Sequence, residues 1–210
     1  MRRGRLLTVA LLALCLVGSA SARAGTSWMS GWTRLNDNPA DGLSRYPIDP
    51  DPYQRATRCL RRGTAQPGTK ALQRWLEQNW RGVSWGIYRC EVWGPHYASL
   101  HAEGRALDWH LSVHNAADKR AAERLIHLLL APDREGNPQA LASRMGIEEL
   151  IWNCHYWGTG ATSFRKYFQC YTPGGKRKKH FNETLAHMDH IHIGLNWAGA
   201  KKRTSFWRHS

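Results

Sequence analysis

Two stretches of the chain place their hydrophobic side chains at the spacing of an α-helix. In the first, residues 67–80, Leu72 and Leu76 lie about one turn apart. Pro67 stands at its start, where a proline fits the first turn of a helix. The second, residues 116–130, repeats this spacing and is soon followed by a proline. The pattern therefore predicts two helices.

Other stretches alternate between hydrophobic and polar residues, or are rich in β-forming residues, as strands are. Strands are predicted at 83–92, 105–113, 147–153 and 190–197, with a further short strand near 167–171. The segments 94–104 and 158–175 contain many turn-forming residues and are expected to be irregular. Together these elements predict an α+β domain in which helices pack on a central, mostly antiparallel sheet.

Two of the predicted strands carry polar side chains on one face and hydrophobic side chains on the other. In 105–113, Asp108 and His110 alternate with leucine and tryptophan, and in the last strand His190 and His192 alternate with isoleucine. Side chains two positions apart in a strand share a face of the sheet. If the two strands are neighbours, their polar groups converge on one face while the opposite face belongs to the core.

His101 adds a third metal-binding side chain close to the first of these strands. It stands seven residues before Asp108, a spacing that would place the two on opposite faces of a continuous strand. Gly104 lies between them and permits a turn that brings the histidine back over the sheet. Two imidazoles and one carboxylate, from His101, Asp108 and His192, leave a fourth tetrahedral position open, as in catalytic zinc sites. We therefore expect one zinc ion per chain on the open face of the sheet.

The first 24 residues have the features of a secretion signal. Three early arginines precede an apolar run at 6–17, and Ala22-Arg23-Ala24 offers a small-residue cleavage site. The apolar run is shorter than the roughly 20 residues that a membrane span needs. We expect 1–24 to be a signal peptide, 25–56 an irregular leader and 57–210 one catalytic domain of a secreted or cell-wall-associated protein. An uncleaved anchor and acylation of Cys15 are the alternatives.

Four cysteines remain after the predicted signal: Cys59, Cys90, Cys154 and Cys170. An even number of cysteines in an exported protein predicts disulfides, and three connectivities are possible. We favour Cys59–Cys90 and Cys154–Cys170, because each pair encloses one local unit. A zinc site made of thiolates is the alternative, but the chain has no Cys-x-x-Cys pair.

The chain is strongly basic. Its formal charge is +14, and the predicted signal carries four of the arginines. For an exported protein, this excess favours an anionic partner such as peptidoglycan or other acidic cell-wall material. Nucleic acid is the competing partner, but the basic residues are scattered apart from 176–179 and no nucleic-acid-binding motif accompanies them. We therefore expect no nucleic acid, no membrane contact once the signal is removed, and a monomer.

Residues 99–108, Ser-Leu-His-Ala-Glu-Gly-Arg-Ala-Leu-Asp, resemble the Ser-x-His-x-x-Gly-x-Ala-x-Asp signature of the D-alanyl-D-alanine metallopeptidases. Those enzymes belong with lysostaphin-type endopeptidases and hedgehog domains in one superfamily, and Asp189-His190-Ile191-His192 resembles its second motif. The similarity runs in order from about 59 to 197 and is close at the two motifs. It implies His101, Asp108 and His192 as zinc ligands on a hedgehog- or D,D-peptidase-like fold.

The resemblance also implies roles for further residues. Many relatives place a glutamate, the general base, three residues before the last histidine ligand, and Asp189 stands there. His190 is the other candidate base, because it shares the ligand face. Arg89 matches an arginine that is thought to hold the substrate carbonyl oxygen or the developing oxyanion. Ser99 is expected to support the first motif by a hydrogen bond, and Glu103 is expected to face solvent.

The function predicted on these grounds is a secreted zinc metallopeptidase of the D,D-carboxypeptidase or endopeptidase type. Its substrate would be an amide bond in peptidoglycan or similar wall peptides, cleaved by zinc-activated water. The first alternative is a catalytically inactive, zinc-stabilised module that binds the wall or another partner. The second is a metal-dependent phosphoesterase or nuclease that uses the same His/Asp cluster.

Overall fold

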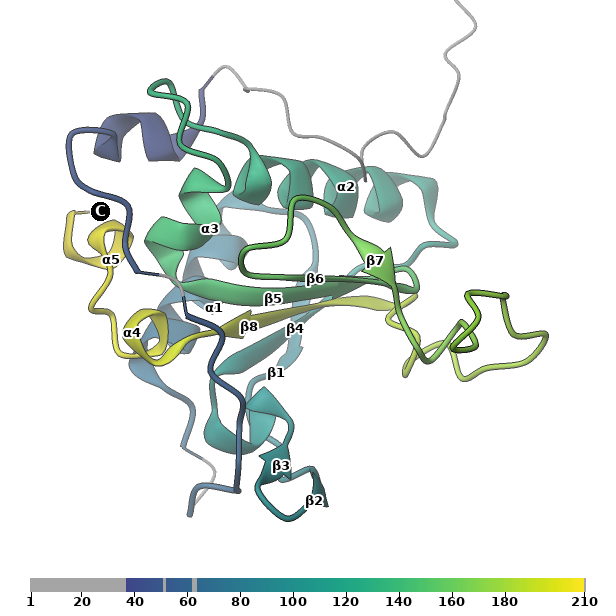
Figure 1. The fold of residues 1–210 in the computed structure, drawn as a ribbon. Coiled ribbons are helices and arrows are strands. Elements are labelled where there is room, and N and C mark those ends of the chain that lie inside the picture. The colour runs from purple at the N-terminus through teal and green to yellow at the C-terminus, as the bar shows by residue number, and fades with distance from the viewer. Residues whose placement is uncertain (1–36, 51, 62–63, 210) are drawn as a thin grey trace, which may run out of the picture.

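The computed structural model describes residues 37–50, 52–61 and 64–209. The predicted signal peptide, residues 1–24, lies outside the described residues, as does the first part of the predicted leader. In the part of the chain that the structure describes, no helix combines the length and the hydrophobicity of a membrane span. The fold is α+β, as predicted, with helices packed on an antiparallel sheet (Figure 1).

Six strands form the main sheet in the order β1-β4-β8-β5-β6-β7, and all neighbours pair antiparallel. Their bounds are β1 Val83–Gly86, β4 Ala106–His110, β5 Ile147–Trp152, β6 His155–Gly158, β7 Arg165–Lys166 and β8 His190–Leu195. A separate hairpin pairs β2, Val92–Gly94, with β3, Tyr97–Ala98. The last strand in sequence, β8, therefore lies inside the sheet, between β4 and β5.

The helices gather on one face of this sheet. They are α1 Pro67–Asn79, α2 Ala116–Leu130, α3 Ala140–Met145, α4 Trp197–Ala200 and α5 Ser205–His209, with the 3-10 turn η2 Pro39–Leu43. The other 3-10 turn, η3 Leu100–Glu103, lies on the opposite face, where His101 meets Asp108 and His192. Leu107 and Trp109 of β4 and Ile191 and Ile193 of β8 are fully buried in the main core, together with Leu125 of α2. The hydrophobic positions of the alternating strands thus form the core, as predicted, and the intervening polar positions face the other way.

Several predicted element boundaries were wrong. The strand predicted at 83–92 is two strands in different sheets, because the chain turns at Gly86, whose φ of 121° is in the region that favours glycine. The segment 94–104, predicted as a loop, contains β3 and η3. The short strand predicted near 167–171 instead lies at β7, and residues 168–170 form a turn.

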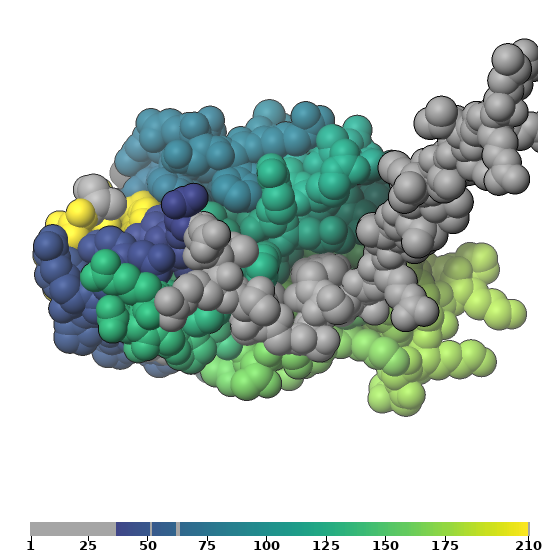
Figure 2. Space-filling view, turned by 90° about the horizontal axis from the view of Figure 1, so that it is seen from above, coloured from purple at the N-terminus to yellow at the C-terminus, as the bar shows by residue number. Residues whose placement is uncertain are grey.

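The described part of the predicted leader packs against the C-terminal end of the chain. Figure 2 shows the first described residues beside the C-terminal ones. Tyr46 stacks on His209 with ring centroids 3.9 Å apart, and Asp49 accepts hydrogen bonds from the backbone N–H of Ser205, 2.9 Å, and from its hydroxyl. These contacts tie the two ends of the described chain together on the helical side of the molecule.

Both predicted disulfides are present. Cys59 is bonded to Cys90 and Cys154 to Cys170, with Cα–Cα distances of 5.3 and 5.6 Å. The first joins the segment that precedes α1 to the segment that follows β1, and the second closes the turn-rich region around β7. The cysteines are therefore used as cross-links rather than as thiolate ligands.

Candidate metal centre

Strand register brings the polar faces of β4 and β8 together. The two strands are antiparallel neighbours in which Asp108 lies opposite His192 and His110 lies opposite His190. Asp108, His190 and His192 are all buried, with 3%, 3% and 4% of their surfaces exposed. The convergence expected from the alternation therefore follows from one pairing of adjacent strands.

A short turn delivers His101 to the same place. The 3-10 turn η3 begins after Ser99, whose hydroxyl accepts a hydrogen bond from the backbone N–H of His101 at 3.3 Å. It ends at Gly104, which has φ 67°. A Cβ at that position would lie 2.0 Å from the carbonyl oxygen of Thr64, so only glycine fits. The turn reverses the chain and places the fully buried His101 ring beside Asp108.

Three donor atoms meet at this point. His101 Nε2 lies 3.0 Å from Asp108 Oδ1 and 3.1 Å from His192 Nδ1, and the last two atoms are 3.1 Å apart. The three residues form a group that could hold a metal ion. Atoms bound tetrahedrally at about 2.0–2.1 Å from zinc are separated by about 3.3–3.4 Å, close to these distances.

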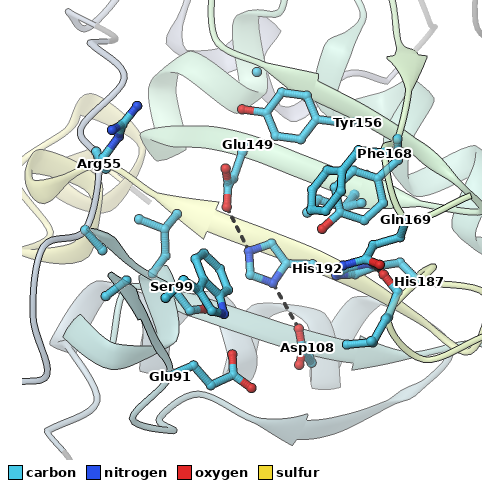
Figure 3. Close-up of a pocket in the computed structure, with 18 of the residues that line it drawn as sticks. Arg55, Glu91, Ser99, Asp108, Glu149, Tyr156, Phe168, Gln169, His187 and His192 are labelled. Carbon is cyan, nitrogen blue, oxygen red and sulfur yellow. Dashed lines mark hydrogen bonds and ion pairs between the residues drawn. The ribbon is translucent and has the colours of Figure 1, made fainter. Parts of the chain in front are cut away.

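The outer nitrogens of the two histidines show why a cation fits among these atoms. His101 Nδ1 is 2.7 Å from the carbonyl oxygen of Ile87, which only accepts, so this nitrogen carries the proton. His192 Nε2 is 3.0 Å from Glu149 Oε1 and carries its proton for the same reason (Figure 3). The inner nitrogens then present lone pairs to each other and to Asp108. Three acceptors without a donor require a proton or a metal ion between them.

The pKa shifts agree with this reasoning. Burial lowers the pKa of His101, although Asp108 opposes the change. Burial also disfavours a charged His192, but hydrogen bonds to Asp108 and Glu149 outweigh it and raise the pKa to about 9. For Asp108, burial acts against the charged form, yet its hydrogen bonds with the two histidines hold the pKa well below the usual range. Without a metal ion, a proton among these three atoms would supply the positive charge, and a bound metal ion would replace it.

His190 and Asp189, the two candidate bases, form a pair. His190 Nδ1 donates to Asp189 Oδ1 at 2.7 Å, and the other oxygen of Asp189 accepts from the Thr184 hydroxyl at 2.5 Å. His190 Nε2 is buried, has no hydrogen-bond partner among the described residues and lies 3.5 Å from Asp108 Oδ1. Burial lowers the pKa of His190, although Asp108 and Asp189 oppose this. Asp189 therefore faces His190, and His190 faces the candidate metal group.

Arg89 contacts the candidate ligand carboxylate. Its Nη1 donates to Asp108 Oδ2, and its Nε donates to Glu91 Oε1 at 2.7 Å. This leaves Asp108 Oδ1 for the metal group. Glu103, expected to face solvent, is instead 5% exposed, and it accepts a hydrogen bond from Nε of the buried Arg105 at 2.9 Å. The expectation for Glu103 was wrong. Arg105, which lies between His101 and Asp108 in the sequence, is buried, and Glu103 is buried beside it as its partner.

Two residues of the site were missed in the sequence. Glu149 is a charged residue inside the hydrophobic strand β5, and this position was itself a signal. His187 precedes β8 in a positive-φ conformation, with its ring centroid 4.6 Å from that of His190 and 5.6 Å from that of His192. Burial lowers the pKa of His187 well below its usual value, and the neighbouring His192 adds to the effect. Its spacing in His-x-x-His-x-His was a signal as well.

The group lies beside a groove of about 1350 Å³ that Asp108, His190 and His192 help to line. Eight large hydrophobic side chains of the described residues are exposed, and six of them line this groove: Tyr53, Trp85, Trp93, Tyr97, Phe168 and Leu185. Exposed hydrophobic side chains concentrated in one concave surface indicate a binding site. Figure 3 shows the groove with Arg55 and Tyr156 along its wall.

The free charges in the groove are positive. Arg55, Arg165 and Lys166 line it, and no ion pair in the described part of the chain joins any of them to a carboxylate. The guanidinium groups of the first two lie over the rings of Tyr97 and Tyr156, at 5.1 and 4.4 Å from the centroids. The acidic residues of the lining are already paired, so the groove suits a ligand with negative charge.

Comparison with known proteins gives one family. The family model described as VldE, C-terminal domain, matches residues 61–181, more than half of the chain. The matched range contains His101 and Asp108 and ends before His190 and His192. Neither a curated protein nor a solved structure matches the chain.

Proposed function

This chain belongs to the family described as VldE, C-terminal domain, and we propose that it is a zinc-dependent peptidase-type hydrolase of cell-wall peptides. The proposal is carried by the convergence of three acceptor atoms, from His101, Asp108 and His192, beside an open groove. Two imidazole nitrogens and one carboxylate oxygen are a donor set of catalytic zinc sites. A zinc ion held by them would polarise a scissile carbonyl and lower the pKa of water.

His190 is the residue that we assign as general base. Its Nε2 is buried next to the candidate metal group and has no partner among the described residues, so its lone pair is available to a proton. The lowered pKa of His190 keeps the ring neutral near pH 7, as a proton acceptor must be. Asp189 accepts a hydrogen bond from the Nδ1–H of His190 and so fixes the tautomer in which Nε2 carries no proton. Asp189 is thus a positioning residue.

Arg89 has two tasks in this proposal. By donating to Oδ2 of Asp108 it orients the carboxylate so that Oδ1 faces the histidines. Its side chain is 43% exposed and lines the groove, so a substrate carbonyl can approach the same guanidinium. A planar cation with several N–H donors suits the negative charge that develops on a carbonyl oxygen during hydrolysis.

The groove supports a wall peptide as substrate. Its exposed aromatic side chains offer apolar contact surface, and Arg55, Arg165 and Lys166 offer positive charge to the carboxylates of a wall peptide. Two disulfides agree with a protein that acts outside the cytoplasm, where such bonds persist. We therefore propose that the protein is exported and acts on peptidoglycan.

Metal analysis and a digestion assay test the proposal together. The purified mature protein is expected to contain one zinc ion per chain, and it is expected to release peptide fragments from purified peptidoglycan that mass spectrometry identifies. His101→Ala should lose zinc and activity together. His190→Ala should keep zinc and lose about 10²- to 10⁴-fold in rate, because only the proton acceptor is removed.

His114→Ala is the matched control, because this histidine is exposed and pairs with Glu183 at the surface. It should retain both zinc and rate. A wild-type protein without zinc would contradict the metal centre. Zinc without fragments would favour a zinc-stabilised binding module, and cleavage of phosphate esters in place of peptides would favour a phosphoesterase.

A further inference from the structure

Glu149 lies on the far side of the His192 ring from the other two candidate ligands. It belongs to β5, which pairs with β8, and its side chain is largely buried, with 8% of the residue exposed. Its Oε1 accepts a hydrogen bond from the Nε2–H of His192 at 3.0 Å, while Nδ1 of the same ring faces Asp108 and His101 (Figure 3). Because the two ring nitrogens point in opposite directions, Glu149 cannot reach an ion held at Nδ1.

The strand next to Glu149 is shaped to admit this side chain. Glu149 is paired with Gly194 of β8. A Cβ on Gly194 would lie 2.7 Å from Cγ of Glu149 and 2.3 Å from Cδ1 of Leu100. A side chain at position 194 would therefore displace Glu149 or Leu100, and with glycine there the glutamate lies across the strand toward His192, two residues earlier on it.

The second oxygen of Glu149 also has a donor. The Tyr53 hydroxyl, from the segment that precedes α1, donates to Oε2 at 3.4 Å. A buried carboxylate that accepts at both oxygens is held in one orientation. Its neighbour Glu148 is used differently, because it pairs with the buried Arg105 at 2.8 Å. The two adjacent glutamates thus serve separate networks.

We infer that Glu149 is a positioning residue that sets the metal affinity of the site through His192. Its carboxylate holds a proton on Nε2, so that Nδ1, which faces the other two candidate ligands, is the nitrogen left to bind an ion. It also increases the electron density that the imidazole offers an ion. His101 receives the second effect more weakly, since its outer nitrogen donates to the uncharged backbone carbonyl of Ile87. The inference rests on the metal centre proposed above.

Zinc affinity of the metal-free protein tests this role without using activity. The mature protein is stripped with a chelator and titrated with zinc in competition with a chromogenic chelator. Glu149→Gln, which keeps the size and removes the charge, should weaken zinc binding about 10- to 100-fold. Glu149→Asp keeps the charge on a shorter side chain, so it should recover part of the loss. Nitrogen NMR of the zinc-loaded wild type should show His192 bound through Nδ1 and protonated at Nε2.

Glu183→Gln is the matched control. Glu183 also pairs with a histidine, His114, at 3.1 Å, but this pair is on the surface. The Glu183→Gln variant should bind zinc as tightly as the wild type does. Urea unfolding of the metal-free variants checks that each is folded. Wild-type affinity in both Glu149→Gln and Glu149→Asp, or His192 bound through Nε2, would overturn the inference while the metal centre stands. A wild type that binds no zinc would overturn the metal centre itself.

Discussion

Replacing Arg105 should destabilise the protein more than replacing any surface arginine. The side chain is fully buried, between the candidate ligands in sequence. Its Nε donates to Glu103 at 2.9 Å, and its Nη1 donates to Glu148 at 2.8 Å and to the carbonyl oxygen of Leu195 at 2.5 Å. Its Nη2 donates to the carbonyl oxygen of Gln54. One guanidinium thus joins η3, β8, β5 and the segment before α1.

The expected cost follows from what Arg105→Met would leave behind. Methionine fills much of the space, but Glu103 and Glu148 lose their buried counter-charge. Breaking a buried ion pair from one side costs about 3–5 kcal/mol. Burial raises the pKa of Glu148, so this carboxyl can take up a proton once the cation is gone, which limits the loss. We therefore expect the lower end, about 3 kcal/mol, out of a typical total stability of about 5–15 kcal/mol.

Urea unfolding of the disulfide-bonded protein, followed by tryptophan fluorescence, measures this cost. With an m-value of about 2 kcal/mol per molar urea, a loss of 3 kcal/mol lowers the midpoint by about 1.5 M. Arg81→Met is the matched control, because Arg81 pairs with Asp118 on the surface with 57% of its side chain exposed. That pair should contribute less than about 1 kcal/mol. Equal midpoints for the two variants would refute the reasoning.

Two further predictions concern stability. Replacing Cys154 and Cys170 together by serine should cost about 3 kcal/mol, because their disulfide closes a loop with a sequence separation of 16; an unchanged urea midpoint would contradict this. Burial acts to raise the pKa of Asp133, but hydrogen bonds from Asn137 and Arg144 outweigh it and lower the pKa. The stability that Asp133 adds is therefore present above its unfolded pKa of about 3.9 and is lost as the pH falls through the folded value. The difference in unfolding free energy between wild type and Asp133→Asn should stay constant from pH 5 to 7 and shrink below about pH 4; a difference that is the same at all pH values would contradict the prediction.

The sequence predicted the centre of the fold better than its edges. The strands β4 and β8 combine strict alternation with full burial of one face, so their pattern determines both the element and the side of each residue. The helices α4 and α5 have four and five residues, too few for a helical period to be visible. They are held by tertiary contacts, such as the bonds between Asp49 and Ser205, that a local pattern does not contain.

The same distinction applies within the site. The resemblance to the D-alanyl-D-alanine metallopeptidases gave Asp189 the position of their glutamate, but it did not indicate where the carboxylate points. In the structure the turn before β8 directs it to Thr184 and to Nδ1 of His190. Two residues earlier, His187 has a positive φ of 55°, a backbone conformation that a histidine in a sequence does not indicate. The place of Asp189 next to the metal group was therefore predictable from the sequence, whereas its hydrogen-bond partners were not.

The two histidines of the candidate centre show how much of a metal site a sequence can reveal. Each needs an acceptor for its outer nitrogen. For His101 the acceptor is the carbonyl oxygen of Ile87, which every amino acid would supply, so no residue type marks it. For His192 it is the carboxylate of Glu149, which stands as a charged residue in a buried strand and costs free energy there unless it is paired. A charge in a core strand thus indicates that a buried partner exists. The sequence marks both Glu148 and Glu149 in this way, and only the structure shows that Glu149 reaches His192 while Glu148 reaches Arg105.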